Sequence, residues 1–215
     1  MSRRKKVWAI IACFAGLAGL PWVTSLRIPR SGKGRFVTAP ARINRNDQGA
    51  WELAKEFQFI DSRGRRWVAP AGTITDGASI PQAFLSLIGD RFENNYLDAA
   101  VVHDAYCGRE NAGRPPYHTE RWHRVHRMFF EACAACGTGP MKAKLMYAAV
   151  YLGGPRWGDP GRSLEGIPRR EIKRVFVECK KWIEANNPPV ERIERWMDEH
   201  ESALRKANGG PGPKP

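Results

Sequence analysis

Acidic residues are absent from the first 35 positions of this chain, and that absence accounts for most of its basic charge. The 215 residues carry a formal net charge of +13, of which residues 1–35 hold +8 and the residues after Glu201 hold +3. Residues 36–201 are therefore nearly balanced, at +2. A nucleic-acid-binding domain neutralises phosphates with basic side chains of its folded part. We therefore expect no nucleic-acid partner.

Cysteine is also scarce, with five residues in the chain. Cys13 lies in an apolar run, and the other four would permit two disulfides in a protein outside the cytoplasm. Cys133 and Cys136 have the spacing of a redox or zinc pair, but zinc would need two further ligands. We interpret both as buried structural residues, because a free cysteine behaves as a small hydrophobic side chain.

Internal repeats are absent, and residues 7–26 form the long apolar run, directly after four consecutive basic residues. This run is about long enough to span a bilayer as a transmembrane anchor. The alternative is a cleaved secretory signal with its apolar core in residues 7–20. We favour the anchor because the run continues through residues 21–23. Basic residues flank both ends equally, but the leading four are consecutive, so we expect an extracytoplasmic domain on a bacterial membrane, or a secreted one after cleavage.

Composition and turn residues predict the domain organisation. One core is expected, because 215 residues suit a single globular domain with appendages. The final residues are rich in glycine and proline, which predicts a disordered tail. The expected parts are a basic N-terminus (1–6), the anchor or signal segment (7–26), a linker (27–35), a globular core (36–158), a C-terminal helical extension (159–207) and the tail (208–215).

Hydrophobic periodicity predicts an α+β fold, in which a small N-terminal β-hairpin or sheet packs on a mainly helical domain preceded by one transmembrane helix. The strands are expected at 51–60 and 66–70, joined by a turn at 61–64. Pro81 is expected to begin a short helix, and Asn94 to cap the next one. The longer helices are expected at 95–106, 119–136, 140–152, 169–185 and 190–206.

His103 and Asp104 end an apolar helical segment, and they are the most informative pair in the sequence. Polar side chains in apolar surroundings are costly unless they find partners, so the pair predicts a site. Asp76, in a Thr-Asp-Gly turn, and His126, on the following helix, are the groups that we expect to meet it. This turn also has a non-catalytic interpretation, because Asp76 can cap the next helix while Gly77 takes a positive φ.

Four segments together resemble the phage and bacterial domain-of-unknown-function family 1353. They are Thr-Asp-Gly-Ala-Ser-Ile-Pro at 75–81, Ala-Ala-Val-Val-His-Asp at 99–104, Phe-Phe-Glu-Ala at 129–132 and Met-Tyr-Ala-Ala-Val at 146–150. The resemblance covers residues 36–158 and implies little established chemistry. The chain departs from the family pattern at Cys107, where a tyrosine is usual, and at His126, where an aspartate is usual.

One chemical hypothesis is a metal-assisted hydrolase, an esterase or a phospholipase-like enzyme. His103 would take a proton from water, with Asp104 as its catalytic partner. Asp104, Asp76 and His126 are the candidate metal ligands. Calcium prefers such carboxylates together with backbone oxygens, which the loop at 72–77 could supply. The His-Asp pair is similar to that of phospholipase A2, in which an aspartate on a neighbouring helix orients the histidine; here His126 stands in that place.

A second hypothesis places zinc near the following helix. Glu120 and His123 are three residues apart, so both could reach one metal, and His118 and His126 are nearby in sequence. Zinc would activate a water molecule. The arginines around His123 argue against this, because they repel a cation.

The alternative to catalysis is a structural role. Buried polar networks often specify a fold without performing chemistry. In that case the chain is a phage-derived or envelope assembly module whose His/Asp network holds the helix and the hairpin together.

Overall fold

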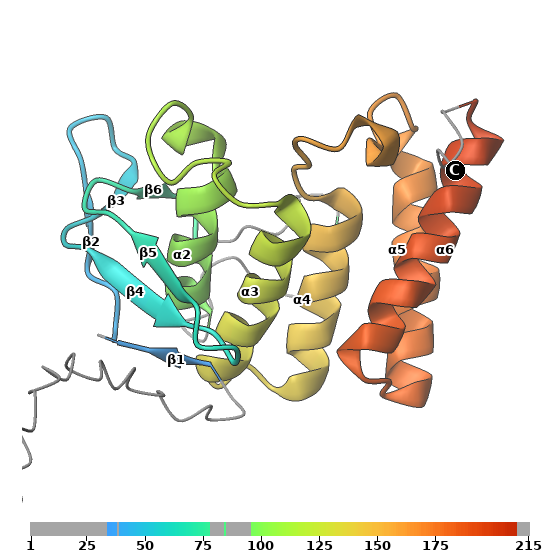
Figure 1. Ribbon diagram of the computed structural model, residues 1–215, viewed down its shortest axis with the longest axis horizontal. Helices are drawn as coiled ribbons and strands as arrows, with labels where there is room; N and C mark the ends of the chain where they lie inside the picture. Colours follow the sequence, from blue (N-terminus) through green and yellow to red (C-terminus); the bar gives the residue numbers. More distant parts are fainter. Residues whose placement is uncertain (1–33, 38, 78–83, 85–95, 210–215) are drawn as a thin grey trace, which may run out of the picture.

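The computed structural model describes residues 34–37, 39–77, 84 and 96–209. In these ranges the protein is α+β, with two small antiparallel sheets and five α-helices. The sheets lie at one side, and α2, α3, α4 and the α5–α6 pair follow one another away from them (Figure 1). The predicted fold class is therefore confirmed for the sheet and the helices.

The six strands form two separate three-stranded sheets. The first has the order β1-β4-β5 and the second the order β2-β3-β6, and all pairs are antiparallel. The strands are β1 (Arg35–Phe36), β2 (Ile43–Arg45), β3 (Trp51–Leu53), β4 (Phe57–Ile60), β5 (Arg66–Ala69) and β6 (Ile74–Thr75).

The predicted hairpin is confirmed as β4 and β5, with Phe57 opposite Ala69 and Ile60 opposite Arg66. The prediction of one continuous strand over 51–60 is wrong. Three exposed residues, 54–56, separate the buried Leu53 from the buried Phe57. The chain turns there because both apolar side chains reach the core, and β3 and β4 consequently join different sheets.

The helices follow the predicted pattern closely. Pro140 begins α4, as expected of a residue that suits a first helical turn. Gly108 follows α2, and Gly137, with a φ of 79°, follows α3. The expected Asn94 cap and the helix from Pro81 lie outside the described residues. The α-helices are α2 (Leu97–Cys107), α3 (Trp122–Ala135), α4 (Pro140–Gly153), α5 (Arg169–Asn186) and α6 (Val190–Ala207), and two short 3₁₀ helices are η1 (Arg109–Asn111) and η2 (Pro160–Arg162).

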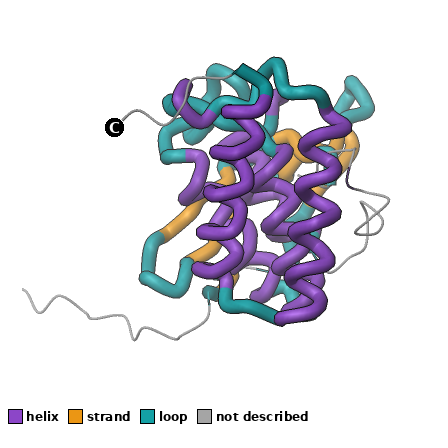
Figure 2. The backbone as a smooth tube through the Cα atoms, turned by 90° about the vertical axis from the view of Figure 1, so that its right-hand side faces the viewer, coloured by secondary structure: helices purple, strands orange, loops and turns teal. Residues whose placement is uncertain are grey.

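One hydrophobic core joins the sheets to all five of these helices. Helices α2 and α4 are its centre, because residues 99–107 and 145–152 are buried on every face. Helices α5 and α6 run side by side (Figure 2). They contribute apolar stripes that include Phe176 and Ile193 to the same core. The two C-terminal helices therefore pack on the core through these stripes.

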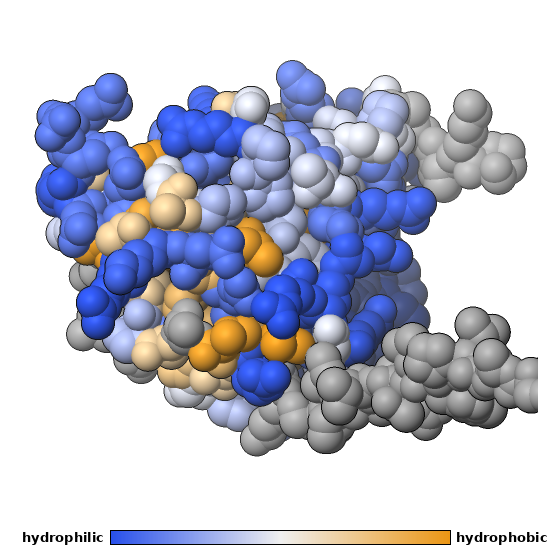
Figure 3. All heavy atoms as spheres, turned by 60° about the vertical axis from the view of Figure 1, so that its left-hand side comes forward, coloured by the Kyte–Doolittle hydropathy of each residue, from blue (hydrophilic) through white to orange (hydrophobic). Residues whose placement is uncertain are grey.

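The proposed anchor at 7–26 and the last six residues lie outside the described ranges. Among the residues that are described, no helix combines the length and apolar character needed to cross a bilayer. The face that carries the sheets is largely hydrophilic, with apolar residues gathered toward its lower edge (Figure 3). Val37, in this part of the chain, is 43% exposed.

Candidate functional site

His103 and Asp104 lie near the C-terminal end of α2, inside the core. Their exposed fractions are 1% and 5%. The cause is local, because α2 is apolar around its whole circumference and is covered by the sheets and by α3. Burial of this polar pair costs free energy unless neighbouring groups form hydrogen bonds with it.

His126 of α3 provides the main partner of His103. The His103 Nε2 and His126 Nδ1 atoms are 2.9 Å apart, and His126 is fully buried. The other ring nitrogen of His126, Nε2, is 3.1 Å from the carbonyl oxygen of Pro155. The predicted meeting of His126 with the His-Asp pair is therefore confirmed on the His103 side.

The Pro155 carbonyl fixes the hydrogen positions in this chain of contacts. A carbonyl oxygen can only accept a hydrogen bond, so Nε2 of neutral His126 carries the hydrogen. Nδ1 of His126 is then an acceptor, and His103 donates to it from Nε2. Nδ1 of His103 is left without a hydrogen, 3.4 Å from the Cys107 sulfur and 3.9 Å from Asp104 Oδ1.

Burial keeps this histidine pair neutral. It lowers the pKa of His103 to about 3. Burial also lowers the pKa of His126 well below its usual value, and the neighbouring His103 and Arg156 lower it further. Burial raises the pKa of the Cys107 thiol, and the carboxylate of Asp104 adds to that effect. The group at physiological pH is two uncharged imidazoles beside a protonated thiol.

Asp104 connects α2 to the strand β6. The Thr75 hydroxyl donates to Asp104 Oδ2 at 2.6 Å and accepts from the Gly77 N–H at 3.0 Å. Two residues of the predicted signature, Thr75 and Gly77, thus hold the turn after β6 against the helix. Gly77 has a φ of 81°, as the turn interpretation predicted.

Asn111 is a central residue that the sequence analysis missed. Its side-chain amide donates to the carbonyl oxygens of Ile74 and Asp104, both at 2.8 Å, and accepts from the Ile74 N–H at 2.9 Å. A Cβ atom on Gly108 would lie 2.8 Å from the Asp104 carbonyl oxygen and 3.1 Å from the Asn111 amide nitrogen. Gly108 therefore makes room for Asn111 as well as ending α2, and this glycine was the available signal.

The two departures from the family pattern both contact the network. Cys107, where a tyrosine is usual, lies with its sulfur against the His103 ring. Tyr106, one position earlier, accepts a hydrogen bond from the Val68 N–H at 3.2 Å and so joins α2 to β5. His126, at the second of these positions, bonds to His103 as an acceptor.

Metal binding by Asp76, Asp104 and His126 stays a prediction. Asp76 lies on the surface just after β6, and both ring nitrogens of His126 face partners other than Asp104. Within the described ranges, no group of three or more His, Cys, Asp or Glu side chains is arranged to hold one metal ion. The three candidate ligands are therefore not assembled as a set.

The residues of the zinc hypothesis each contact other groups. His123 Nε2 accepts a hydrogen bond from Arg162 at 3.0 Å, and burial followed by the charge of Arg162 lowers the pKa of His123. His118 stacks between Tyr117 and Trp157 at centroid distances of 3.7 and 4.1 Å. Glu120 pairs with Arg65 and Arg124.

The four described cysteines are free thiols. Burial raises the pKa of Cys133, and burial raises that of Cys136 to about 12. Thiolate chemistry needs a lowered pKa, so these values agree with the structural interpretation of the Cys-Ala-Ala-Cys sequence.

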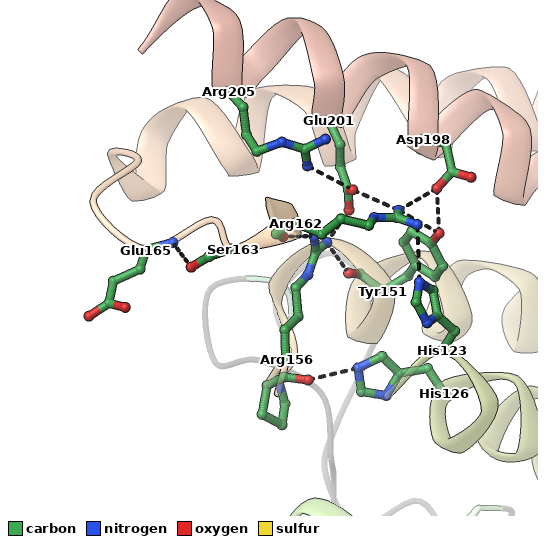
Figure 4. Close-up of polar contacts among 11 residues, drawn as sticks. His123, His126, Tyr151, Arg156, Arg162, Ser163, Glu165, Asp198, Glu201 and Arg205 are labelled. Carbon is green, nitrogen blue, oxygen red and sulfur yellow. Dashed lines mark hydrogen bonds and ion pairs between the residues drawn. The ribbon is translucent and has the colours of Figure 1, made fainter. Parts of the chain in front are cut away.

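A second buried polar cluster surrounds Glu201 of α6, which is fully buried. Its carboxylate bonds to Arg156, to Arg162 at 2.9 Å and to Arg205 at 3.3 Å. Arg162 also pairs with Asp198, and Tyr151 donates to the same carboxylate (Figure 4). We call these residues the Glu201 cluster, and no pattern in the sequence predicted it.

Comparison with known proteins agrees with the resemblance found in the sequence. Residues 51–150 match the family described as "Protein of unknown function (DUF1353)". The chain is 42% identical to "Uncharacterized protein y4jT" of Sinorhizobium fredii over 126 residues, which are 58% of this chain and 35% of that protein. It is 41% identical to "Uncharacterized protein y4iH" of the same organism over 106 residues, which are 49% of this chain and 41% of that protein. No solved structure matches the chain.

The chain thus spans well under half the length of these two curated relatives. The matched residues 51–150 contain His103, Asp104, His126, Asn111 and Thr75, whereas Pro155, Glu201 and the arginines around Glu201 lie after them. Over residues 51–150 this chain therefore resembles the DUF1353 family of proteins of unknown function.

Proposed function

We propose that this chain is a membrane-tethered, non-catalytic module, of phage or envelope type, in which the His103–His126–Asp104 network is structural. The observation that carries the proposal is the bonding of this network inside the protein. His103 bonds to His126, His126 bonds to the Pro155 carbonyl, and Asp104 bonds to Thr75. These contacts join α2, α3, β6 and the loop after α4.

Two further properties support a structural role. General-base catalysis is most efficient when the pKa of the base lies near the working pH. Burial instead lowers the pKa of His103 to about 3, far from that range. The histidine is also 1% exposed, so a substrate would have to enter the core to reach it.

The tethering part of the proposal rests on residues 7–26. An apolar run of this length behind four basic residues supports an anchor, and the short leading segment supports an extracytoplasmic domain. An alkaline phosphatase fusion placed after Leu26 should be active, because that enzyme needs the oxidising space outside the cytoplasm. An inactive fusion of normal abundance would overturn this orientation.

The non-catalytic proposal is tested with the full chain purified in detergent. Calcium or zinc at millimolar concentration should leave the thermal midpoint unchanged. A metal that bound the folded state would instead raise the midpoint, because a ligand at 100 times its Kd adds about 2.7 kcal/mol. The rate of hydrolysis of nitrophenyl esters and of phospholipid vesicles should equal that of a folded His103→Gln variant. A metal-dependent rise of the midpoint, or an activity that His103→Gln abolishes, would refute the proposal.

A hydrolase is the second candidate, because one ring nitrogen favours it. Nδ1 of His103 has no hydrogen, is held in place through His126, and lies 3.9 Å from an Asp104 oxygen. In this candidate, an ester or phospholipid hydrolase, Nδ1 takes a proton from water and Asp104 stabilises the resulting imidazolium. A calcium or zinc ion at Asp76 and Asp104 would be a further requirement. The thermal midpoint with added metal and the hydrolysis rate of His103→Gln distinguish the hydrolase from the non-catalytic module.

A further inference from the structure

The histidine pair His103 and His126, with the groups bonded to it, is called the neutral network here. It meets the Glu201 cluster at residues 154–156. The carbonyl oxygen of Pro155 accepts from His126 Nε2 at 3.1 Å. The next residue, Arg156, extends its guanidinium to Glu201 (Figure 4). It also donates to the carbonyl oxygens of Tyr151 at 2.6 Å and of Arg162 at 2.7 Å. A single short stretch of backbone therefore touches both groups.

Glu201 holds Arg156 firmly. A buried charge that loses its partner is strongly destabilising, so the carboxylate and the guanidinium cannot separate at low cost. Arg156 also packs over the ring of Trp122, 4.5 Å from its centroid, on the same helix as His126. The position of the Arg156 main chain, and with it the Pro155 carbonyl, is thereby fixed against α3.

Gly154 adds a steric observation to the same place. A Cβ atom at this position would lie 2.3 Å from the Val150 carbonyl oxygen and 3.2 Å from His126 Nε2. The chain consequently passes α4 and His126 at a distance that only glycine allows. Such a close approach is expected where a backbone group serves as a fixed hydrogen-bond partner.

We propose that Glu201, acting through Arg156 and the Pro155 carbonyl, is a positioning residue that sets the hydrogen positions on His126 and His103. The α5–α6 hairpin, which follows the family match, thus determines which nitrogen of His103 is free to accept a proton. This inference does not depend on whether the network is catalytic or structural. It concerns only which ring nitrogens of His103 and His126 carry a hydrogen.

The test is NMR of the ring nitrogens in the full chain labelled with ¹⁵N-histidine, with signals assigned from single His→Gln variants. In the wild type, His103 and His126 should each show a hydrogen on Nε2 and none on Nδ1. In Glu201→Gln the loss of the charge should release Arg156, and His126 should show both tautomers. Glu199→Gln, an exposed change on the same helix, is the matched control and should leave the wild-type spectrum.

A purely structural role for Glu201 gives a different result. It would lower the thermal midpoint of Glu201→Gln but leave a single Nε2–H tautomer on His126. That outcome overturns the inference, as does an Nδ1–H tautomer in the wild type. Arg156→Lys keeps the positive charge but loses the bonds to several acceptors. If Glu201→Gln does not fold, the tautomers of His126 in Arg156→Lys are measured instead: both tautomers support the inference, and a single Nε2–H tautomer overturns it.

Discussion

The two buried polar clusters described above are stabilised in opposite ways. Around His103 the side chains are mainly neutral, and burial lowers the pKa values of both histidines. Around Glu201 the side chains are charged, and three arginines converge on one carboxylate. The difference teaches that a group titrating near neutral pH loses its charge on burial, whereas arginine keeps its charge and needs a buried acid.

This comparison predicts different sensitivities for the two groups. The neutral network should respond to pH, because protonation of either buried histidine would introduce a positive charge into the core. The Glu201 cluster should respond to removal of its acid, because the arginines cannot lose their protons. The following changes test each side, from the largest expected effect to the smallest.

Removal of the acid should give the largest effect. In Glu201→Ala the guanidinium groups of Arg156 and Arg205 remain buried without their partner. We expect the free energy of unfolding to fall by about 3–5 kcal/mol, the cost of breaking a buried ion pair. Urea unfolding of the variant followed by circular dichroism measures this. A loss below about 1 kcal/mol would mean that the cluster behaves like an exposed ion pair.

Acidification should destabilise the protein through the histidine pair. Unfolded histidine has a pKa of about 6.5, and the folded values of His103 and His126 lie below it, so the unfolded state binds more protons as the pH falls. Their contribution is complete well above pH 6.5 and is lost as the pH falls through that value. From pH 7 to 5 we expect a loss of about 2 kcal/mol for each histidine, because the slope approaches about 1.4 kcal/mol per pH unit once unfolded histidine is protonated.

Unfolding curves in urea at several pH values check this slope. The double variant His103→Gln/His126→Gln should show a flatter dependence, and His200→Gln, at a half-buried position of α6 outside the pair, is the control. A wild-type stability that does not change between pH 7 and 5 would contradict the expectation.

A smaller effect is expected from Asn111→Ala. The change leaves the N–H and carbonyl of Ile74 and the carbonyl of Asp104 without their side-chain partner. The Ile74 groups lie at a sheet edge that water can reach, so the expected loss is about 2 kcal/mol, within the range of 1–3 for a buried unsatisfied group. Thermal unfolding measures it, and Asn186→Ala at the exposed end of α5 is the control.

The smallest effect is expected from Lys180→Ala, which removes an exposed ion pair with Glu184 on α5. Pairs four residues apart on a helix surface contribute about 0.3–0.5 kcal/mol. A loss as large as that of Glu201→Ala would show that burial is not what separates the two kinds of ion pair. The same urea assay makes the comparison direct.

The sequence predicted the parts of this structure that depend on neighbours along the chain. The apolar run before His103 indicated a buried helix, and Gly108 and Pro140 marked helix ends. The meeting of His126 with His103 followed from the expected order of two packed helices. These signals are local or periodic, so a single sequence contains them.

The missed features depend on contacts between distant segments. Glu201 looked like one acid among many on an amphipathic helix, because its three arginines come from the loop after α4, from η2 and from its own helix. Asn111 bonds mainly to backbone atoms, and the pattern of side chains in a sequence does not predict such partners. The division of the strand at residues 54–56 likewise depends on two sheets that form only in the folded chain.

The bond pattern of Asn111 has a consequence for how copies of this protein meet one another. Strand β6 is at the outer edge of its sheet, and the Asn111 amide bonds to both the N–H and the carbonyl of Ile74, as an adjacent strand would. An open edge is a template on which another chain can add a strand and begin aggregation. Asn111 closes that edge with a single side chain, so chains crowded at one surface have no free β6 backbone at Ile74 through which to polymerise.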